Sequence, residues 1–396
     1  METTGKANVE YAAQASAAAL SGEVRLTLGE DALTVAAPLD AAELPYASIR
    51  SLARENYGVT VNADGGAYRF SKMGNQSEAF YDALFAAYNK KVRKALFVSG
   101  TPLLKAQGEY RFEERGAAGR GSAPIEVYES FVLFLPPNDE ARRVPLCFVT
   151  ALEKAGFSLT LRIGDEESYA FSKLGYDTEP FAQALEKLLR DLREKALAAA
   201  KELDPSLSPA QAAAVARLTP EGAAAPIGTL RGIAPSFASA LERELSLSRS
   251  AREFEVLRSL SDPQKIYVGR KKRFDAPESE PDDTMLFMIA PGRSEKTAAV
   301  EFAVAEGETA ATFLYRFDGG FDAFARAFNR ALEAISFHRE AIRLSEAELE
   351  KPQYADAAMA VRRNASLRFI RAAFAGRVIH ASQESWAQGV KNHLGP

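Results

Sequence analysis

The sequence predicts an α+β protein that contains tandem copies of one structural unit. Residues 68–74 read Tyr-Arg-Phe-Ser-Lys-Met-Gly, and residues 169–175, which follow 101 positions later, read Tyr-Ala-Phe-Ser-Lys-Leu-Gly. The similarity continues without a gap into segments with helical periodicity, where Phe80 corresponds to Phe181. Self-similarity at a fixed period indicates a repeated supersecondary unit. Each copy combines alternating strand patterns with one amphipathic helix, which predicts the α+β class.

Upstream of these segments the offset is 100 residues, because one residue is inserted in a hairpin of the second copy. Pro45 and Tyr57 there correspond to Pro145 and Phe157. A third copy is weaker, since residues 315–319 read Tyr-Arg-Phe-Asp-Gly and lack the Ser-Lys pair. The repeat is therefore primarily a structural unit, and the fold does not need its lysine.

A chain of 396 residues is long enough for two or three domains. We expect two complete units, a helical spacer, a degenerate third unit and a helical tail rich in basic residues. Their predicted bounds are 1–100, 101–200, 201–262, 263–344 and 345–396.

The elements of the first copy follow from its hydrophobic periodicity. Alternating apolar residues over 24–35 predict a β-hairpin, and residues 44–52 are interpreted as a further strand. Residues 57–61 are expected to pair with residues 67–71 through an Asp-Gly-Gly turn. The period then becomes helical, with Ser77 as the predicted N-cap.

The other copies show the same order of patterns. Further strands are expected over residues 110–112, 125–128, 131–135, 265–269, 285–290, 299–304 and 311–317, and a helix over about 324–344. The glycine-rich segment 116–121 is interpreted as a hairpin loop.

Capping signals predict short helices in the spacer and the tail. Ser208 with Gln211 and Ser250 with Glu253 are candidate capping boxes of the spacer. Its apolar residues require burial, so we expect the spacer to pack between the repeats. In the tail, Ser345 restarts a helix, and residues 355–381 are also predicted to be helical.

This order of elements, several antiparallel strands closed by one long C-terminal helix, resembles the pleckstrin-homology-like superfold, including its bacterial and GRAM-type relatives. The residues that carry the resemblance are the Leu-Pro-Tyr-Ala-Ser-Ile segment at 44–49, the hairpin through residues 64–66 and the helix from Glu78. Lipid-binding relatives carry basic residues around the first hairpin. The first copy has Gly-Glu-Asp at residues 29–31 instead, so the resemblance does not imply phosphoinositide binding by this copy.

Composition and charge exclude several classes of function. Apolar residues make up 47% of the chain and charged residues 26%, which is typical of globular proteins with sizeable cores. The net charge of -4 creates no field that would attract phosphate backbones, so nucleic-acid binding is not expected. A single cysteine cannot form an intramolecular disulfide, which fits a reducing compartment.

The sequence predicts neither secretion nor a transmembrane segment. Glu10 and Gln14 interrupt the alanine-rich start, which therefore does not read as a signal peptide. The longest strongly apolar run, residues 285–290, is too short to cross a bilayer. We expect a cytoplasmic protein, and the abundance of alanine and arginine suits a GC-rich bacterial genome.

The residues that usually carry chemistry form no recognisable motif. His338, His380 and His393 lack the spacing of metal ligands. Cys147 corresponds to Ala47 in the repeat and is interpreted as a small core or interface residue rather than a nucleophile. No phosphate-binding glycine loop and no nucleophile elbow is present. We therefore expect no catalytic residue, no metal and no organic cofactor.

One basic cluster is a candidate binding site for an anionic surface. Arg270, Lys271, Lys272 and Arg273 directly follow a predicted strand, where pleckstrin-homology-like lipid binders hold phosphates. The alternative is a solvated turn that acidic residues at 275–283 neutralise. The tail arginines could likewise contact an acidic partner or anionic lipid, but they spread around their helix, which favours a solvated tail. They are Arg362, Arg363, Arg368, Arg371 and Arg377.

These observations favour a non-catalytic scaffold or adaptor that presents protein-binding surfaces through its tandem units. The first alternative is peripheral binding to anionic membranes through the basic cluster of the third copy. The second is an enzyme whose site is assembled between domains and is not visible in the sequence.

Overall fold

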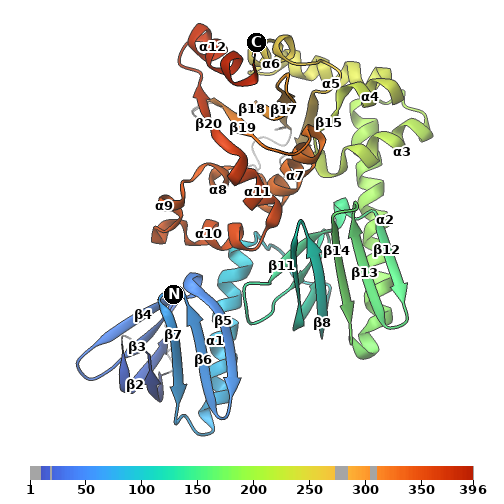
Figure 1. Cartoon of the computed structure of the whole chain (residues 1–396). Helices are drawn as coiled ribbons and strands as arrows, with labels where there is room; N and C mark the ends of the chain where they lie inside the picture. Colours follow the sequence, from blue (N-terminus) through green and yellow to red (C-terminus); the bar gives the residue numbers. More distant parts are fainter. Residues whose placement is uncertain (1–9, 18–19, 273–283, 304–309, 396) are drawn as a thin grey trace, which may run out of the picture. The chain divides into compact units, whose positions relative to one another are not determined.

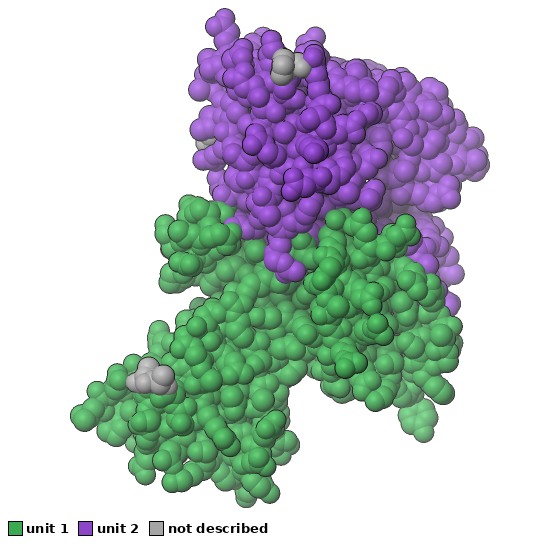
Figure 2. Space-filling view, in the orientation of Figure 1, with its two compact units in different colours: residues 1–144, 153–181, 344–365 green, residues 145–152, 182–343, 366–396 purple. Residues whose placement is uncertain are grey.

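The computed structural model describes residues 10–17, 20–272, 284–303 and 310–395. It is a mixed α and β structure with antiparallel sheets (Figure 1). The chain divides into two compact units, each assembled from segments that are distant in the sequence (Figure 2). Unit 1 contains Met1–Val144, Glu153–Phe181 and Leu344–Ala365, and unit 2 contains Pro145–Leu152, Ala182–Arg343 and Ser366–Pro396.

The first sheet has seven strands in the order β4-β3-β2-β1-β7-β6-β5. They are β1 (Glu10–Ser16), β2 (Ser21–Leu28), β3 (Ala32–Ala36), β4 (Ala41–Pro45), β5 (Ile49–Glu55), β6 (Gly58–Ala63) and β7 (Gly66–Ser71). β1 is absent from the sequence prediction, because small alanines carry only a weak alternating signal. Its Tyr11, Ala13 and Ala15 are buried, and it pairs with both β2 and β7.

Three predictions for the first copy are confirmed and two are wrong. β2 and β3 form the hairpin predicted over residues 24–35. β6 and β7 form the expected hairpin. Helix α1 (Gln76–Ala95) buries Phe80, Leu84 and the following residues of the predicted face. The expected strand over 44–52 is instead divided by the 3-10 helix η1 (Tyr46–Ser48). The N-cap is Asn75, without a side-chain hydrogen bond, and Ser77 lies buried inside the helix.

The second sheet repeats this strand order, as β11-β10-β9-β8-β14-β13-β12. Its strands are β8 (Leu104–Glu114), β9 (Ala117–Val127), β10 (Phe131–Phe134), β11 (Arg142–Pro145), β12 (Ala151–Ala155), β13 (Ser158–Ile163) and β14 (Glu167–Ser172). The glycine-rich segment 116–121 lies almost entirely in β9, because Glu114 already pairs with Ala117. After the 3-10 helix η3 (Gly175–Asp177), helix α2 (Thr178–Leu203) follows. Phe181 is 2% exposed and its counterpart Phe80 is fully buried.

The spacer is helical and packed, as predicted. It contains α3 (Pro209–Leu218), the 3-10 helix η4 (Pro220–Gly222), α4 (Ile227–Ile233), α5 (Pro235–Leu247) and α6 (Ala251–Leu260). The capping box of Ser208 and Gln211 is present. The one predicted at Ser250 is wrong, because the Ser250 hydroxyl donates to the carbonyl of Phe302, 3.3 Å away. Apolar spacer residues, among them Leu230 and Leu241, enter the core of unit 2.

The third sheet has six strands in consecutive order. They are β15 (Ala225–Pro226), β16 (Tyr267–Lys272), β17 (Thr284–Pro291), β18 (Thr297–Phe302), β19 (Ala311–Arg316) and β20 (Phe374–Ile379). β16 to β19 lie close to the predicted positions. The expected helix over 324–344 is shorter, as α7 (Phe321–Ala334), and α8 (Glu340–Arg343) follows it.

The C-terminal segment is not a solvated helical tail. It forms α9 (Glu346–Leu349), the 3-10 helix η5 (Pro352–Tyr354), α10 (Ala355–Arg362), α11 (Ala365–Ala373), β20 and α12 (Gln383–Leu394). Residues 374–379 are a strand rather than the predicted helix, because they pair with β19. Arg363 and Trp386 are each 1% exposed. Within the described part of the chain, no helix is both long and apolar enough to span a membrane.

Candidate functional site

A surface pocket of about 640 Å³ opens on the second seven-stranded sheet. It lies where the turn between β12 and β13 approaches the end of β14 and the start of η3. Its lining residues are Ala155, Phe157, Ser158, Ser172, Lys173, Gly175 and Tyr176. We call this group the aromatic pocket.

Two exposed aromatic rings line the aromatic pocket. Phe157 is 79% exposed and Tyr176 is completely exposed, at 103%. Aromatic side chains are usually at least partly buried, because their large apolar area is costly to hydrate. Phe157 aligns with Tyr57 in the repeat, and neither residue was predicted to have a function. The available signal was an aromatic residue at the same turn of both copies.

The recurring Ser-Lys-x-Gly sequence shapes the wall of the pocket. Lys173 and Gly175 both have left-handed backbone conformations, with φ of 53° and 60°. Their counterparts Lys72 and Gly74 have φ of 58° and 54°. Glycine adopts this conformation without strain, and a lysine does so at a cost. The motif is therefore a chain reversal between the last strand and the helix, which explains why it recurs.

The Lys173 side chain lies at the rim of the pocket. Its ammonium nitrogen Nζ donates to Oε1 of Glu109 on β8 at 2.7 Å, and the two side chains are 73% and 42% exposed. Ion pairs this exposed contribute little to stability, because water solvates both charges. The amine can therefore exchange Glu109 for another carboxylate at little cost.

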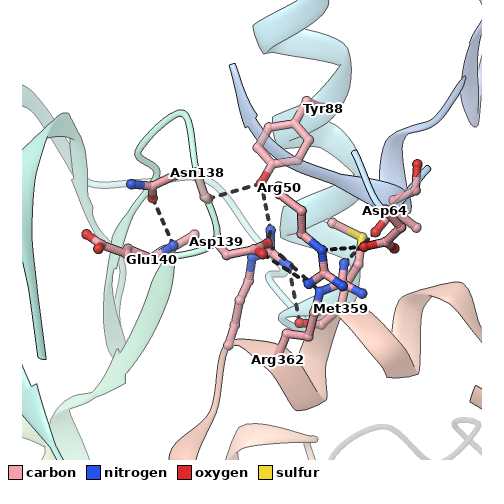
Figure 3. A network of polar contacts seen from close by, with 12 residues as sticks. Arg50, Asp64, Tyr88, Asn138, Asp139, Glu140, Met359 and Arg362 are labelled. Carbon is pink, nitrogen blue, oxygen red and sulfur yellow. Dashed lines mark hydrogen bonds and ion pairs between the residues drawn. The ribbon is translucent and has the colours of Figure 1, made fainter. Parts of the chain in front are cut away.

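A partly buried polar network centred on Asp139 links the first two sheets within unit 1 (Figure 3). Asp139 lies in the loop between β10 and β11. Its Oδ2 is 3.1 Å from Nη1 of Arg50 on β5, and its Oδ1 is 2.9 Å from Nη2 of Arg363. Arg363 also donates to the Tyr88 hydroxyl on α1 at 2.6 Å. That hydroxyl donates in turn to the carbonyl of Asn138 at 3.0 Å, and burial raises the pKa of Tyr88.

Backbone contacts and a second ion pair reinforce this junction. The amide of Leu52 donates to the carbonyl of Pro137 at 2.7 Å, so the loop lies along the edge of β5. Elsewhere, Nη2 of Arg93 on α1 is 2.9 Å from Oε1 of the buried Glu126 on β9.

Burial and the neighbouring Arg50 and Arg363 lower the pKa of Arg362. Arg362 and Arg363, expected in a solvated tail, are instead structural residues of unit 1.

The described residues of the predicted basic cluster lie in a strand and are paired with acids. Arg270, Lys271 and Lys272 belong to β16 rather than to a turn, and Arg273 lies outside the described residues. Nε of Arg270 is 2.8 Å from Glu244, Nζ of Lys272 is 2.7 Å from Glu202, and Lys271 pairs with Glu221. Their acidic partners come from the helices of the spacer region. The anionic-surface hypothesis stays a prediction.

The histidines and the cysteine occupy separate places. His380 lies in unit 2, where its Nε2 is 3.3 Å from Oε2 of the fully buried Glu301. Thr312 donates to the same oxygen at 2.5 Å and accepts from Nε1 of Trp386 at 2.7 Å. Cys147 is half-buried. In the described ranges, no cluster of three or more His, Cys, Asp or Glu residues is suited to hold a metal ion.

Comparisons with known proteins do not indicate a function for these sites. No model of a known protein family matches the sequence, and a search of curated proteins finds no similar sequence.

Proposed function

We propose that the chain is a non-catalytic adaptor with two pleckstrin-homology-like units that present protein-binding surfaces. The common strand order of the first two sheets, each followed by a helix, supports this fold assignment. The junction around Asp139 supports a scaffold role, because it fixes one sheet relative to the other within unit 1.

The aromatic pocket carries the proposal. Aromatic side chains dominate the binding energy of protein interfaces, because they combine a large apolar area with few rotatable bonds. Burying one such ring under a partner contributes about 1.5 to 3 kcal/mol. Phe157 and Tyr176 lie beside a preformed concavity with two serine hydroxyls and one amine at its wall. This combination suits an apolar anchor side chain of a partner protein, with polar contacts at the rim.

The same lining favours recognition over acid–base chemistry. Acid–base catalysis requires groups that donate and accept protons at the reacting atom. The charged side chain of the pocket lining is Lys173, whose amine is held by Glu109. A protein partner is favoured over a membrane, because the described basic residues of β16 are already paired with Glu202, Glu221 and Glu244.

A selection experiment tests this function. A library of random short peptides on phage is panned over the full-length chain, and enriched peptides are measured against a Phe157→Ser/Tyr176→Ser double variant. We expect enriched peptides with an apolar anchor residue, and at least about a tenfold loss of affinity in the double variant. Leu39→Ser is the matched control, since Leu39 is completely exposed but lies on the turn between β3 and β4.

The proposal is abandoned if the library yields no enriched peptide, or if the double variant binds the enriched peptides as tightly as the natural chain. Equal losses in the double variant and in Leu39→Ser would also contradict it.

A further inference from the structure

The first seven-stranded sheet carries residues that correspond to several lining residues of the aromatic pocket. Tyr57, which is 74% exposed, occupies the position of Phe157. Ser71, Lys72 and Gly74 occupy the positions of Ser172, Lys173 and Gly175, whereas Asn75 replaces Tyr176. We call Tyr57, Ser71, Lys72 and Gly74 the second aromatic site. Both sites belong to unit 1.

The backbone of Tyr57 is strained, and the packing of its exposed side chain does not offset the strain. Glu55 pairs with Gly58, so Asn56 and Tyr57 form a two-residue hairpin turn, with φ of 49° and 58°. Such turns favour glycine at the second position, because a bulky side chain in the left-handed region is disfavoured. The Tyr57 ring is largely solvated and recovers little packing energy. Strain of this kind persists mainly at functional sites.

The second aromatic site also carries a lysine without the acidic neighbour found in the other copy. In the second sheet, Ser172 pairs with Glu109, and that carboxylate holds Lys173. In the first sheet, the corresponding Ser71 pairs with Gln14. Across the described ranges, no ion pair to Lys72 is found. Its charge therefore complements a carboxylate supplied by a partner.

The junction around Asp139 joins the two sheets that carry the sites. Arg50 belongs to the sheet with Tyr57, Asp139 lies in a loop of the sheet with Phe157, and Arg363 donates to both Asp139 and Tyr88 of α1. Sites on two joined sheets can be occupied by one ligand, whose second contact then forms at a high effective concentration.

We propose that unit 1 binds one partner protein at both sites simultaneously, each site taking an apolar side chain that lies next to a carboxylate. The partner is thus a protein with two copies of an acidic, apolar segment. This inference rests on the proposed adaptor function, and it adds the valency and the charge of the partner.

Tandem peptides test the inference with the full-length chain. A peptide enriched in the panning above is synthesised as a single copy and as two copies joined by flexible glycine-serine linkers of several lengths. For the natural chain we expect the best tandem peptide to bind at least about tenfold more tightly than the single copy. Tyr57→Gly, which relieves the backbone strain and removes the ring, should abolish this gain and leave the affinity of the single copy within about twofold.

Three further variants make the result specific. Tyr57→Phe should keep the gain, because the ring remains. Leu39→Ser should also keep it, because this exposed residue of the same sheet is outside the site. Lys72→Gln should reduce the gain for acidic peptides at low salt. The difference between the variant and the natural chain should shrink at high salt, since exposed charges are screened.

The outcomes separate the two proposals. If enriched peptides depend on Phe157 and Tyr176 but the tandem form shows no gain, or if Tyr57→Gly keeps the gain, the two-site inference is wrong and the adaptor function stands. If no peptide depends on the aromatic pocket, both proposals fall. If the chain instead sediments with phosphatidylserine vesicles and Tyr57→Gly abolishes that, the partner is a membrane and the inference is overturned.

Discussion

Arg363 donates to Oδ1 of Asp139 at 2.9 Å, although the two residues are 224 positions apart in the chain. The Arg363 side chain is completely buried, and that of Asp139 is 31% exposed. One nitrogen of Arg363, Nη2, also reaches the Tyr88 hydroxyl. The C-terminal segment that brings Arg363 therefore completes unit 1, whose other segments are Met1–Val144 and Glu153–Phe181.

Replacing Arg363 with Met should destabilise the protein strongly. The variant removes a buried cation and leaves Tyr88 and part of Asp139 without their donor. We expect a loss of about 3 kcal/mol in the free energy of unfolding, measured by urea denaturation. Arg25→Met is the matched control, because Arg25 and Glu10 form an exposed pair, with side chains 76% and 58% exposed, and should cost less than about 1 kcal/mol. Equal losses in both variants would show that the Asp139 junction does not stabilise unit 1.

Replacing Tyr57 with Gly should stabilise the protein. Glycine adopts the φ of 58° without strain, and this gain outweighs the larger entropy of glycine in the unfolded chain. We expect an increase of about 0.5 to 1 kcal/mol in the free energy of unfolding. Phe157→Gly is the control, because Phe157 is not among the positive-φ residues and should give no increase. A loss of stability in Tyr57→Gly would contradict the strain argument.

His380 should make stability depend on pH. Burial lowers its pKa, but the contact with Glu301 and the charge of Glu253 raise the pKa above its usual value of 6.5 overall. A raised folded-state pKa contributes stability that is fully present below about pH 6.5 and is lost as pH rises through the folded-state pKa. We expect the stability difference between the natural chain and His380→Gln to shrink with rising pH above this point.

This difference must be taken at each pH by urea denaturation, because burial lowers the pKa of His393, which acts in the opposite direction. A difference that grows with rising pH, or that does not change, would be inconsistent with a charged pair of His380 and Glu301.

Replacing Gly269 with Ala should overpack the third sheet. A Cβ atom at this position would lie 2.1 Å from Cε1 of the Phe287 ring on the neighbouring strand β17. Phe287 is fully buried and cannot move freely, so we expect a loss of about 1 to 3 kcal/mol. Gly319→Ala is the control, because its Cβ would meet nothing within 4 Å. Comparable thermal unfolding of both variants would show that the ring yields to the methyl group.

Local signals in the sequence were sufficient where neighbouring residues decide the structure. The hairpin between β6 and β7, the apolar face of α1 and the capping box at Ser208 follow from turn chemistry, a helical period and side-chain caps. The exposed rings of the candidate site were not predicted, because the sequence shows that an aromatic residue recurs but not whether it is buried. The left-handed conformation of Tyr57 is equally invisible until the register of β5 and β6 is known.

By itself, the sequence determined that strands and helices alternate in tandem copies, because hydrophobic period and turn residues act over a few positions. Only the tertiary structure decided the conformation and the burial of the C-terminal segment. Residues 374–379 become a strand because β19 offers an unpaired edge there, and Arg363 can be buried because Asp139 supplies a negative charge and both Asp139 and Tyr88 accept from its Nη2. Such pairings depend on groups that lie far apart in the chain, 68 positions for Ala311 and Ile379 and 224 for Asp139 and Arg363, and no local pattern encodes them.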